Sequence, residues 1–142
     1  MKKYSIIIFI LVFLALIILL YSRSQTQKQS IPLATQTDSQ GAVIVQVTPI
    51  DVSKTAKTWQ FKILLNTHTV NLDQDLTKMV ILRNSYGDIY TPISWEGDPL
   101  GGHHREGTLS FKPISPKPPA ITLIIREIGE VPERTFSWKL GR

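Results

Sequence analysis

The chain has 142 residues, which is enough for one domain beside a terminal segment, and its formal charge is +5. It contains no Cys, which excludes disulfides, thiol catalysis, thiolate metal sites and an acylated lipoprotein N-terminus. Without Lys2, Lys3 and Arg23 the charge falls from +5 to +2, and no dense Lys/Arg stripe follows, so we expect no nucleic-acid partner.

The first element is an apolar run at residues 5–20 (SIIIFILVFLALIILL), which contains no charge, Gly or Pro. As a helix it would span about 24 Å, close to the hydrocarbon thickness of a bilayer. Tyr4 and Tyr21 flank it where aromatic residues meet the membrane interface. The alternative is a cleaved signal peptide, but residues 21–25 (YSRSQ) lack an Ala-x-Ala-like cleavage site. The sequence therefore favours residues 1–21 as an uncleaved single-pass anchor in the lipid bilayer.

Residues 22–41 are rich in Ser, Thr and Gln, which is typical of a flexible linker. Lys2 and Lys3 precede the anchor while Arg23 and Lys28 follow it, so the charge bias across the membrane is weak. Small N-terminal anchors of this layout usually keep the N-terminus in the cytoplasm. We therefore expect the C-terminal domain, residues 42–142, to lie outside the cytoplasm at the cell membrane.

From residue 42 onward the apolar residues alternate with a period of two, which indicates strands with one buried face. The strands expected from this alternation and from turn signals lie at residues 43–48, 59–66, 78–83, 89–93, 108–112, 121–125 and 136–140. No amphipathic helix is expected among them. About seven short strands predict a mainly β domain, an immunoglobulin-like antiparallel β-sandwich, with a small barrel as the alternative.

Two polar loops contain all three histidines of the chain. His68, Asp73 and Asp75 follow the second expected strand, and His103 and His104 precede the fifth. The strand count allows both loops to lie at one end of the domain. Imidazole and carboxylate ligands suit a divalent metal such as Zn²⁺ or Cu²⁺, so these five residues form a candidate metal site. The alternative is a structural polar network of the same residues.

Two further residues of the second loop have open roles. Arg105 either supports a carboxylate ligand or orders the Gly-rich loop, and Trp95 either lines a shallow pocket or caps the open end of the sandwich. No Gly-x-Ser-x-Gly elbow and no Cys nucleophile is present, so the sequence identifies no catalytic residues.

The loop residues also carry a resemblance. They are Thr67-His68, Asp73-x-Asp75-Leu76, Tyr90-x-Pro92-x-x-Trp95-x-Gly97 and Gly101-Gly102-His103-His104-Arg105-x-Gly107-x-Leu109-x-Phe111. This arrangement resembles a group of small uncharacterised prokaryotic proteins that are membrane-anchored or exported and carry a β domain. The resemblance implies that the His loop is a recurring element, and it implies no activity.

Three functions are compatible with these observations. The first is a tethered domain that binds a divalent metal through the His/Asp cluster. The second is an interaction or accessory module for a neighbouring membrane protein, in which the same loops are structural. The third is a metal-assisted hydrolase, which would need an open coordination position in a cleft.

Overall fold

The computed structural model describes residues 13–15, 17 and 33–141, and the chain forms two compact units, Met1–Ile31 and Pro32–Arg142. The described residues of the first unit are helical. No helix within the described residues is both long and apolar enough to cross a membrane. The expected anchor at residues 1–21 lies mostly outside the described residues, and it stays a prediction.

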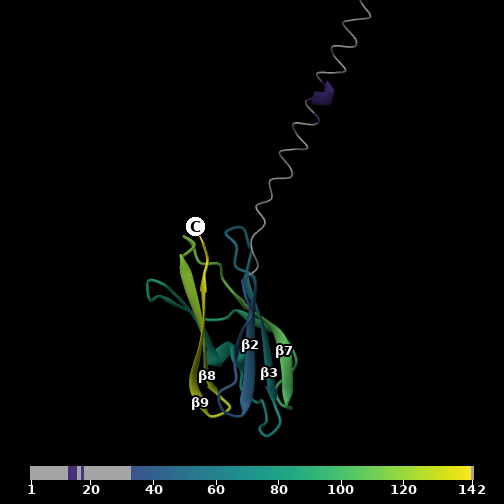
Figure 1. Cartoon of the computed structure of the whole chain (residues 1–142), viewed down its shortest axis with the longest axis vertical. Helices are drawn as coiled ribbons and strands as arrows, with labels where there is room; N and C mark the ends of the chain where they lie inside the picture. Colours follow the sequence, from purple (N-terminus) through teal and green to yellow (C-terminus); the bar gives the residue numbers. More distant parts are fainter. Residues whose placement is uncertain (1–12, 16, 18–32, 142) are drawn as a thin grey trace, which may run out of the picture. The chain divides into compact units, whose positions relative to one another are not determined.

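The second unit is mainly β (Figure 1), as the sequence predicts. Its described residues form two antiparallel sheets, with the strand orders β1-β2-β3-β7-β6 and β5-β4-β8-β9. The first sheet contains β1 (Gln36–Asp38), β2 (Val43–Asp51), β3 (Trp59–Thr67), β6 (Ser94–Gly97) and β7 (His104–Phe111). The second contains β4 (Val80–Asn84), β5 (Ile89–Tyr90), β8 (Ala120–Ile128) and β9 (Val131–Lys139), and the short helix α2 (Leu76–Met79) precedes β4.

The alternation in the sequence determines which face of each strand is buried. Val43, Val45 and Val47 of β2 are fully buried, whereas Ile44 between them is exposed. Val45 lies opposite Leu65 of β3, which is also fully buried, so both strands present the same face to the core. A shift of one residue in this register would turn the buried valines toward solvent.

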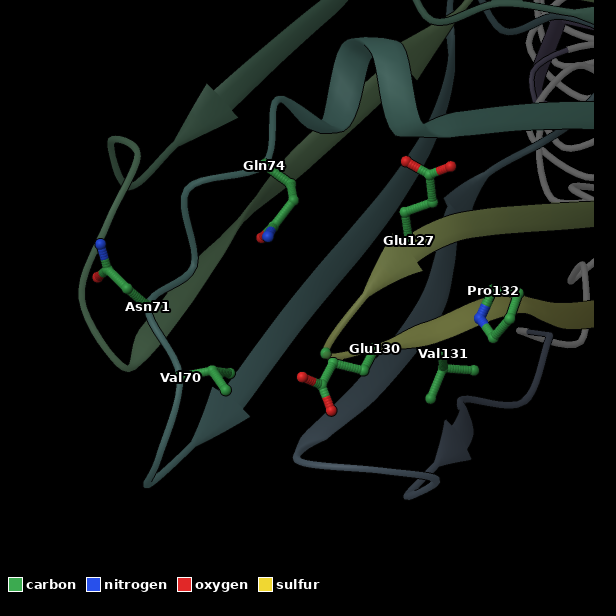
Figure 2. A pocket seen from close by; sticks show the side chains of 8 residues that line it. Val70, Asn71, Gln74, Glu127, Glu130, Val131 and Pro132 are labelled. Carbon is green, nitrogen blue, oxygen red and sulfur yellow. The ribbon is translucent and has the colours of Figure 1, made fainter.

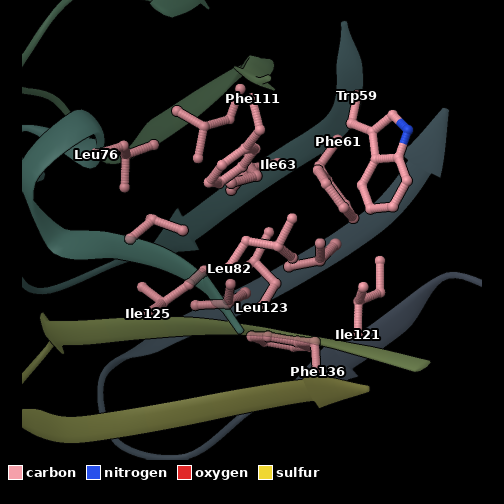
Figure 3. Packing of buried hydrophobic residues seen from close by; sticks show 14 of the residues in the cluster. Trp59, Phe61, Ile63, Leu76, Leu82, Phe111, Ile121, Leu123, Ile125 and Phe136 are labelled. Carbon is pink, nitrogen blue, oxygen red and sulfur yellow. The ribbon is translucent and has the colours of Figure 1, made fainter. Parts of the chain in front are cut away.

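The core lies between the two sheets (Figure 3). Phe61, Ile63 and Phe111 project from the first sheet toward Leu82, Leu123 and Phe136 of the second. The rings of Phe61 and Phe111 meet edge to face, with centroids 5.7 Å apart and planes at 86°. The Trp138 ring on β9 lies 5.9 Å from the Phe61 ring and thereby joins the two sheets.

The chain enters the domain at one end of the sheets. There the Ala34 carbonyl accepts a hydrogen bond of 2.7 Å from Trp138 Nε1, and Leu140 N donates to Pro119 O. We call this the entry end; it comprises residues 33–35, 50–58, 85–88, 112–119 and 139–141. The opposite, distal end comprises residues 39–42, 68–75, 98–103 and 127–132.

Strand β1 lies within the residues that the sequence assigns to the linker, so the folded domain begins earlier than expected. Its Asp38 side chain forms an ion pair of 2.5 Å with Arg134 of β9, whose side chain is 0% exposed. Arg134 also donates to the carbonyls of Gln40 and Ile128. Gln36 exchanges two hydrogen bonds with the backbone of Ser137. These contacts connect the edges of the two sheets.

The Gly-rich segment before Thr108 also differs from the expectation of a loop. Residues 94–97 form β6, and β7 begins at His104 rather than at Thr108. His104 and Arg105 therefore lie on a strand, which gives their side chains opposite directions. The structure also adds α2, so residues 33–141 form nine strands and one short helix where about seven strands and no helix were expected.

Candidate functional site

The two polar loops meet at the distal end, as the strand count allows. They meet because β3 and β7 are antiparallel neighbours, and the segment after β3 continues the pairing with the segment before β7. Thr67 N donates to His103 O (2.9 Å), and Leu72 N donates to Gly102 O (3.0 Å). Gly101 N donates back to Leu72 O (2.9 Å). We call this contact between residues 67–75 and 98–105 the loop clasp.

The Asn71 side chain fastens the outer part of the loop clasp. Its Oδ1 accepts a hydrogen bond of 2.6 Å from Gly102 N, and its Nδ2 donates to Asp73 Oδ1 at 2.5 Å. Gly101 and Gly102 both have positive φ angles, 104° and 74°, which glycine adopts without steric cost. Asp73 is thus held by Asn71 within the same loop.

Arg105 fastens the inner part. Its side chain points into the domain, the residue is 1% exposed, and Nη1 donates to the carbonyls of Leu72 (3.1 Å) and Gln74 (2.7 Å). Burial lowers the pKa of Arg105, and the charges of Asp75, Asp98 and Asp73 act in the opposite direction. Arginine stays charged in proteins, so a buried cation orders this loop through main-chain carbonyls.

Trp95 covers Arg105 from the neighbouring strand β6. The guanidinium carbon lies 5.5 Å from the centre of the indole ring, within the range of a cation–π interaction. The ring fits there because Gly97 and Gly107 lie opposite each other on β6 and β7. A Cβ atom on Gly107 would lie 2.6 Å from Trp95 Cζ2. The indole Nε1 donates to Asp98 O (3.0 Å), so Trp95 is a structural cover of the clasp.

The histidines do not converge. His104 lies on the outer face of β7, where its Nδ1 is 2.6 Å from Oδ1 of Asn66 on β3. His68 and His103 are exposed. The expectation that the neighbouring side chains of His103 and His104 diverge agrees with the extended strand that begins at His104.

Asp75 has a local role at the start of α2. Its Oδ1 accepts hydrogen bonds from Thr77 N (3.0 Å) and Thr77 Oγ1 (2.6 Å), which is the geometry of a helix N-cap. These bonds, and Lys78 at 3.4 Å, lower the pKa of Asp75. The carboxylate is therefore occupied by its own helix.

The candidate metal site is consequently not supported. Within residues 33–141 no three His, Asp or Glu side chains are grouped so that they could hold a metal ion. Of the five expected ligands, His104, Asp73 and Asp75 have partners of their own, and His68 and His103 are exposed. The metal-assisted hydrolase required the same convergence of ligands.

A shallow hollow of about 480 Å³ lies beside the loop clasp. Figure 2 shows the side chains that line it. The hollow separates residues 70–74 from the turn between β8 and β9. Its lining residues are Val70, Asn71, Gln74, Glu127, Gly129, Glu130, Val131 and Pro132. Glu127 and Glu130 adopt positive φ angles of 56° and 61°, which are rare outside glycine.

The sequence alone does not indicate this hollow. Its one local signal is Gly129-Glu130 between the alternating residues of β8 and β9, a pattern typical of a tight turn. Comparison with protein-family models, with curated proteins and with solved structures found no match to this chain.

Proposed function

We propose that this protein is a membrane-tethered extracytoplasmic interaction module, with an immunoglobulin-like sandwich whose His/Asp loops are structural. The strand order supports the fold type. Taking β2, β3, β7 and β6 as strands A, B, E and D, and β5, β4, β8 and β9 as C′, C, F and G, reproduces the immunoglobulin arrangement. The strand β1 is an addition at the edge.

The observation that carries an interaction function is the set of unused polar groups around the hollow at the distal end. Gln74 Oε1 is buried there and has no hydrogen-bond partner. Glu127 and Glu130 form no ion pair with any residue in the described part of the chain. A buried oxygen without a donor costs about 1–3 kcal/mol, which a partner that supplies a donor would recover.

The backbone of the turn supports the same proposal. A left-handed conformation costs a non-glycine residue about 1–2 kcal/mol, and the β8–β9 hairpin contains two such residues, Glu127 near the end of β8 and Glu130 in the turn. Residues held in rare conformations cluster at binding sites. The partner that fits is a protein segment with cationic or N–H donor groups, because the lining supplies acceptors.

The test is photo-crosslinking of the full chain in its native membrane. A photoreactive residue replaces Val131, which lines the hollow, or Lys62, which lies in the middle of β3. We expect a discrete adduct from position 131 only, and its loss in the Glu127→Gln/Glu130→Gln variant. The matched control is Asp73→Asn/Asp98→Asn, which removes two distal charges outside the hollow. No adduct from position 131, or the same adduct from position 62, would contradict the proposal.

A further inference from the structure

The charged residues of the domain are separated along its length. The entry end contains Lys54, Lys57, Lys112, Lys117 and Lys139, and its acidic residues are Asp51 and Asp88. The other nine carboxylates lie in the middle and distal parts of the domain, with six basic residues among them. Residues 33–141 contain equal numbers of basic and acidic side chains, so this separation gives the domain opposite charges at its two ends.

The lysines of the entry end have no carboxylate partner among residues 33–141. Each of the four ion pairs recorded among residues 33–141 involves a base from the middle or distal part, namely Lys62, Lys78, Arg126 or Arg134. Lys54, Lys57, Lys112 and Lys139 are exposed, and Lys117 donates to the Leu140 carbonyl. Lysine side chains that surround the end of a sandwich without carboxylate partners make that end electropositive.

Exposed apolar side chains accompany these lysines. Tyr86, at the tip of the turn between β4 and β5, is 71% exposed, and Ile50 at the end of β2 is 54% exposed. Basic groups together with an exposed aromatic ring fit the interface of an anionic bilayer, where the ring enters the headgroup region and ammonium groups contact phosphates.

We propose that the entry end docks on an anionic lipid surface; this rests on the proposed membrane tether and adds an orientation to it. The chain itself brings this end to the bilayer, because residues 1–32 join the domain here. The part of the predicted linker that precedes the described domain, residues 22–32, would span about 18 Å as a random coil. This span exceeds the Debye length, which is about 8 Å at physiological ionic strength. Salt would therefore screen the lysines from the lipid charges until the domain approaches the surface.

The chain has no native Cys, so single labels report the orientation directly. Ser85→Cys at the entry end and Thr69→Cys at the distal end are exposed positions of similar polarity. The full chain is reconstituted in vesicles of phosphatidylcholine alone or mixed in equal parts with phosphatidylglycerol, and both types carry a nitroxide lipid that quenches a fluorophore at the headgroups. We expect phosphatidylglycerol to increase quenching at position 85 and to leave position 69 unchanged, and added salt to reverse the increase.

The matched variants remove equal charge from the two parts of the domain. Each lysine near an anionic surface raises the equilibrium constant of docking about fivefold. The variant Lys54→Gln/Lys57→Gln/Lys112→Gln should therefore lower this constant about a hundredfold. Lys62→Gln/Lys78→Gln/Arg126→Gln should retain it. Equal loss in both variants, or quenching at position 85 that ignores phosphatidylglycerol, would overturn the docking proposal. Quenching at position 85 that occurs in native membranes, and in neither type of vesicle, would also overturn the docking proposal. A membrane protein, and not the lipid, would then bind the entry end.

Flotation of the vesicles separates this failure from a failure of the tether. A chain that floats with vesicles of either composition, but shows no lipid-dependent quenching, is anchored without docking. A chain that fails to float with phosphatidylcholine vesicles lacks the anchor, which contradicts the proposed tether and the docking proposal that rests on it.

Discussion

Two buried arginines are held in different ways in this small domain. Arg134 has a carboxylate partner, Asp38, and two carbonyl partners. Arg105 has two carbonyl partners and an indole ring, and no carboxylate forms an ion pair with it among residues 33–141. Each arginine has a buried Nε without a partner. Both side chains therefore connect segments that are distant in sequence at some electrostatic cost.

The first prediction concerns Arg105. Arg105→Met should reduce the free energy of unfolding by about 3 kcal/mol, because the carbonyls of Leu72 and Gln74 lose their donor inside the domain. Urea unfolding of the full chain in detergent measures it. The control is His104→Ala on the exposed side of the same strand, which should change the value by about 0.5 kcal/mol or less. A similar small change for Arg105→Met would refute a structural role of the clasp.

The second prediction is a pH dependence from Asp38. Burial raises the pKa of this carboxyl, but hydrogen bonds from Gln40 and the charge and hydrogen bond of Arg134 outweigh it, so its pKa lies below the ordinary 3.8. A carboxyl with a depressed pKa stabilises the fold fully above its unfolded value, and this contribution is lost as pH falls through the folded value. Wild-type stability should therefore decrease as pH falls below 3.8.

Asp38→Asn provides the comparison. The variant should be less stable than the wild type at pH about 7, and the difference should shrink as the wild-type carboxylate becomes protonated. Urea midpoints between pH about 2 and 7 measure both curves. A difference that stays constant over this range would show that the carboxylate charge does not contribute.

At the level of elements, the third prediction concerns β1. A chain that begins at Ala42 lacks the Asp38 carboxylate, the Gln36 side chain and the Ala34 carbonyl, all of which contact β9. Loss of the partner of a buried charge costs about 3–5 kcal/mol, so this chain should be much less stable than one that begins at Pro32. It should also self-associate, because β2 loses its neighbouring strand β1 and becomes an open edge of its sheet. Thermal melting and sedimentation compare the two, and equal melting temperatures would assign β1 to the linker after all.

The fourth prediction concerns the paired glycines of β6 and β7. A Cβ atom on Gly107 would lie 2.6 Å from Trp95 Cζ2 and 2.7 Å from the Glu96 carbonyl oxygen. The added methyl group of Gly107→Ala must displace both the Trp95 ring and the backbone at Glu96. This should reduce the free energy of unfolding by about 1–3 kcal/mol. The neighbouring Thr108→Ala, which is half-buried and meets no such contact, is the control. Equal stability of the two variants would show that the ring is not held over this pair.

The strands were predicted correctly where their buried side chains are apolar and their exposed side chains are polar. The alternating valines of β2 and the aromatic residues of β3 and β9 indicate strands from sequence alone. Strand β1 is polar, because its Gln36 and Asp38 face the edge of the other sheet rather than an apolar core. Strand β6 contains Gly97, which is small enough to leave room for the Trp95 indole ring. In the sequence, a glycine at this position indicates a loop.

The site was predicted only in part for a related reason. Strand counting showed that the two loops could lie together, since it depends on topology alone. The convergence of ligands depends on local hydrogen bonds, and Asp75 caps its own helix while Asn71 holds Asp73. The direction of Arg105 follows from the alternation that also buries Leu109 and Phe111, but only if β7 begins at His104 rather than at Thr108.

The whole molecule combines a basic end, where the chain enters, with a hollow at the opposite end. A strand of nine residues such as β3 spans about 30 Å, so a docked domain would hold the hollow at about this height above the lipid. An undocked domain on the proposed tether would sample a range of heights and orientations. Docking would thereby raise the effective concentration of the hollow near a membrane partner whose binding segment lies at that height.

This coupling leads to the fifth prediction, in which the two ends are changed separately in native membranes. Lys54→Gln/Lys57→Gln/Lys112→Gln should reduce crosslinking from position 131 without changing the urea midpoint, because these side chains are exposed and outside the hollow. Glu127→Gln/Glu130→Gln should abolish the same adduct but retain lipid-dependent quenching at position 85. If removal of the lysines leaves the adduct yield unchanged, the two ends act independently, and the tether alone brings the hollow to its partner.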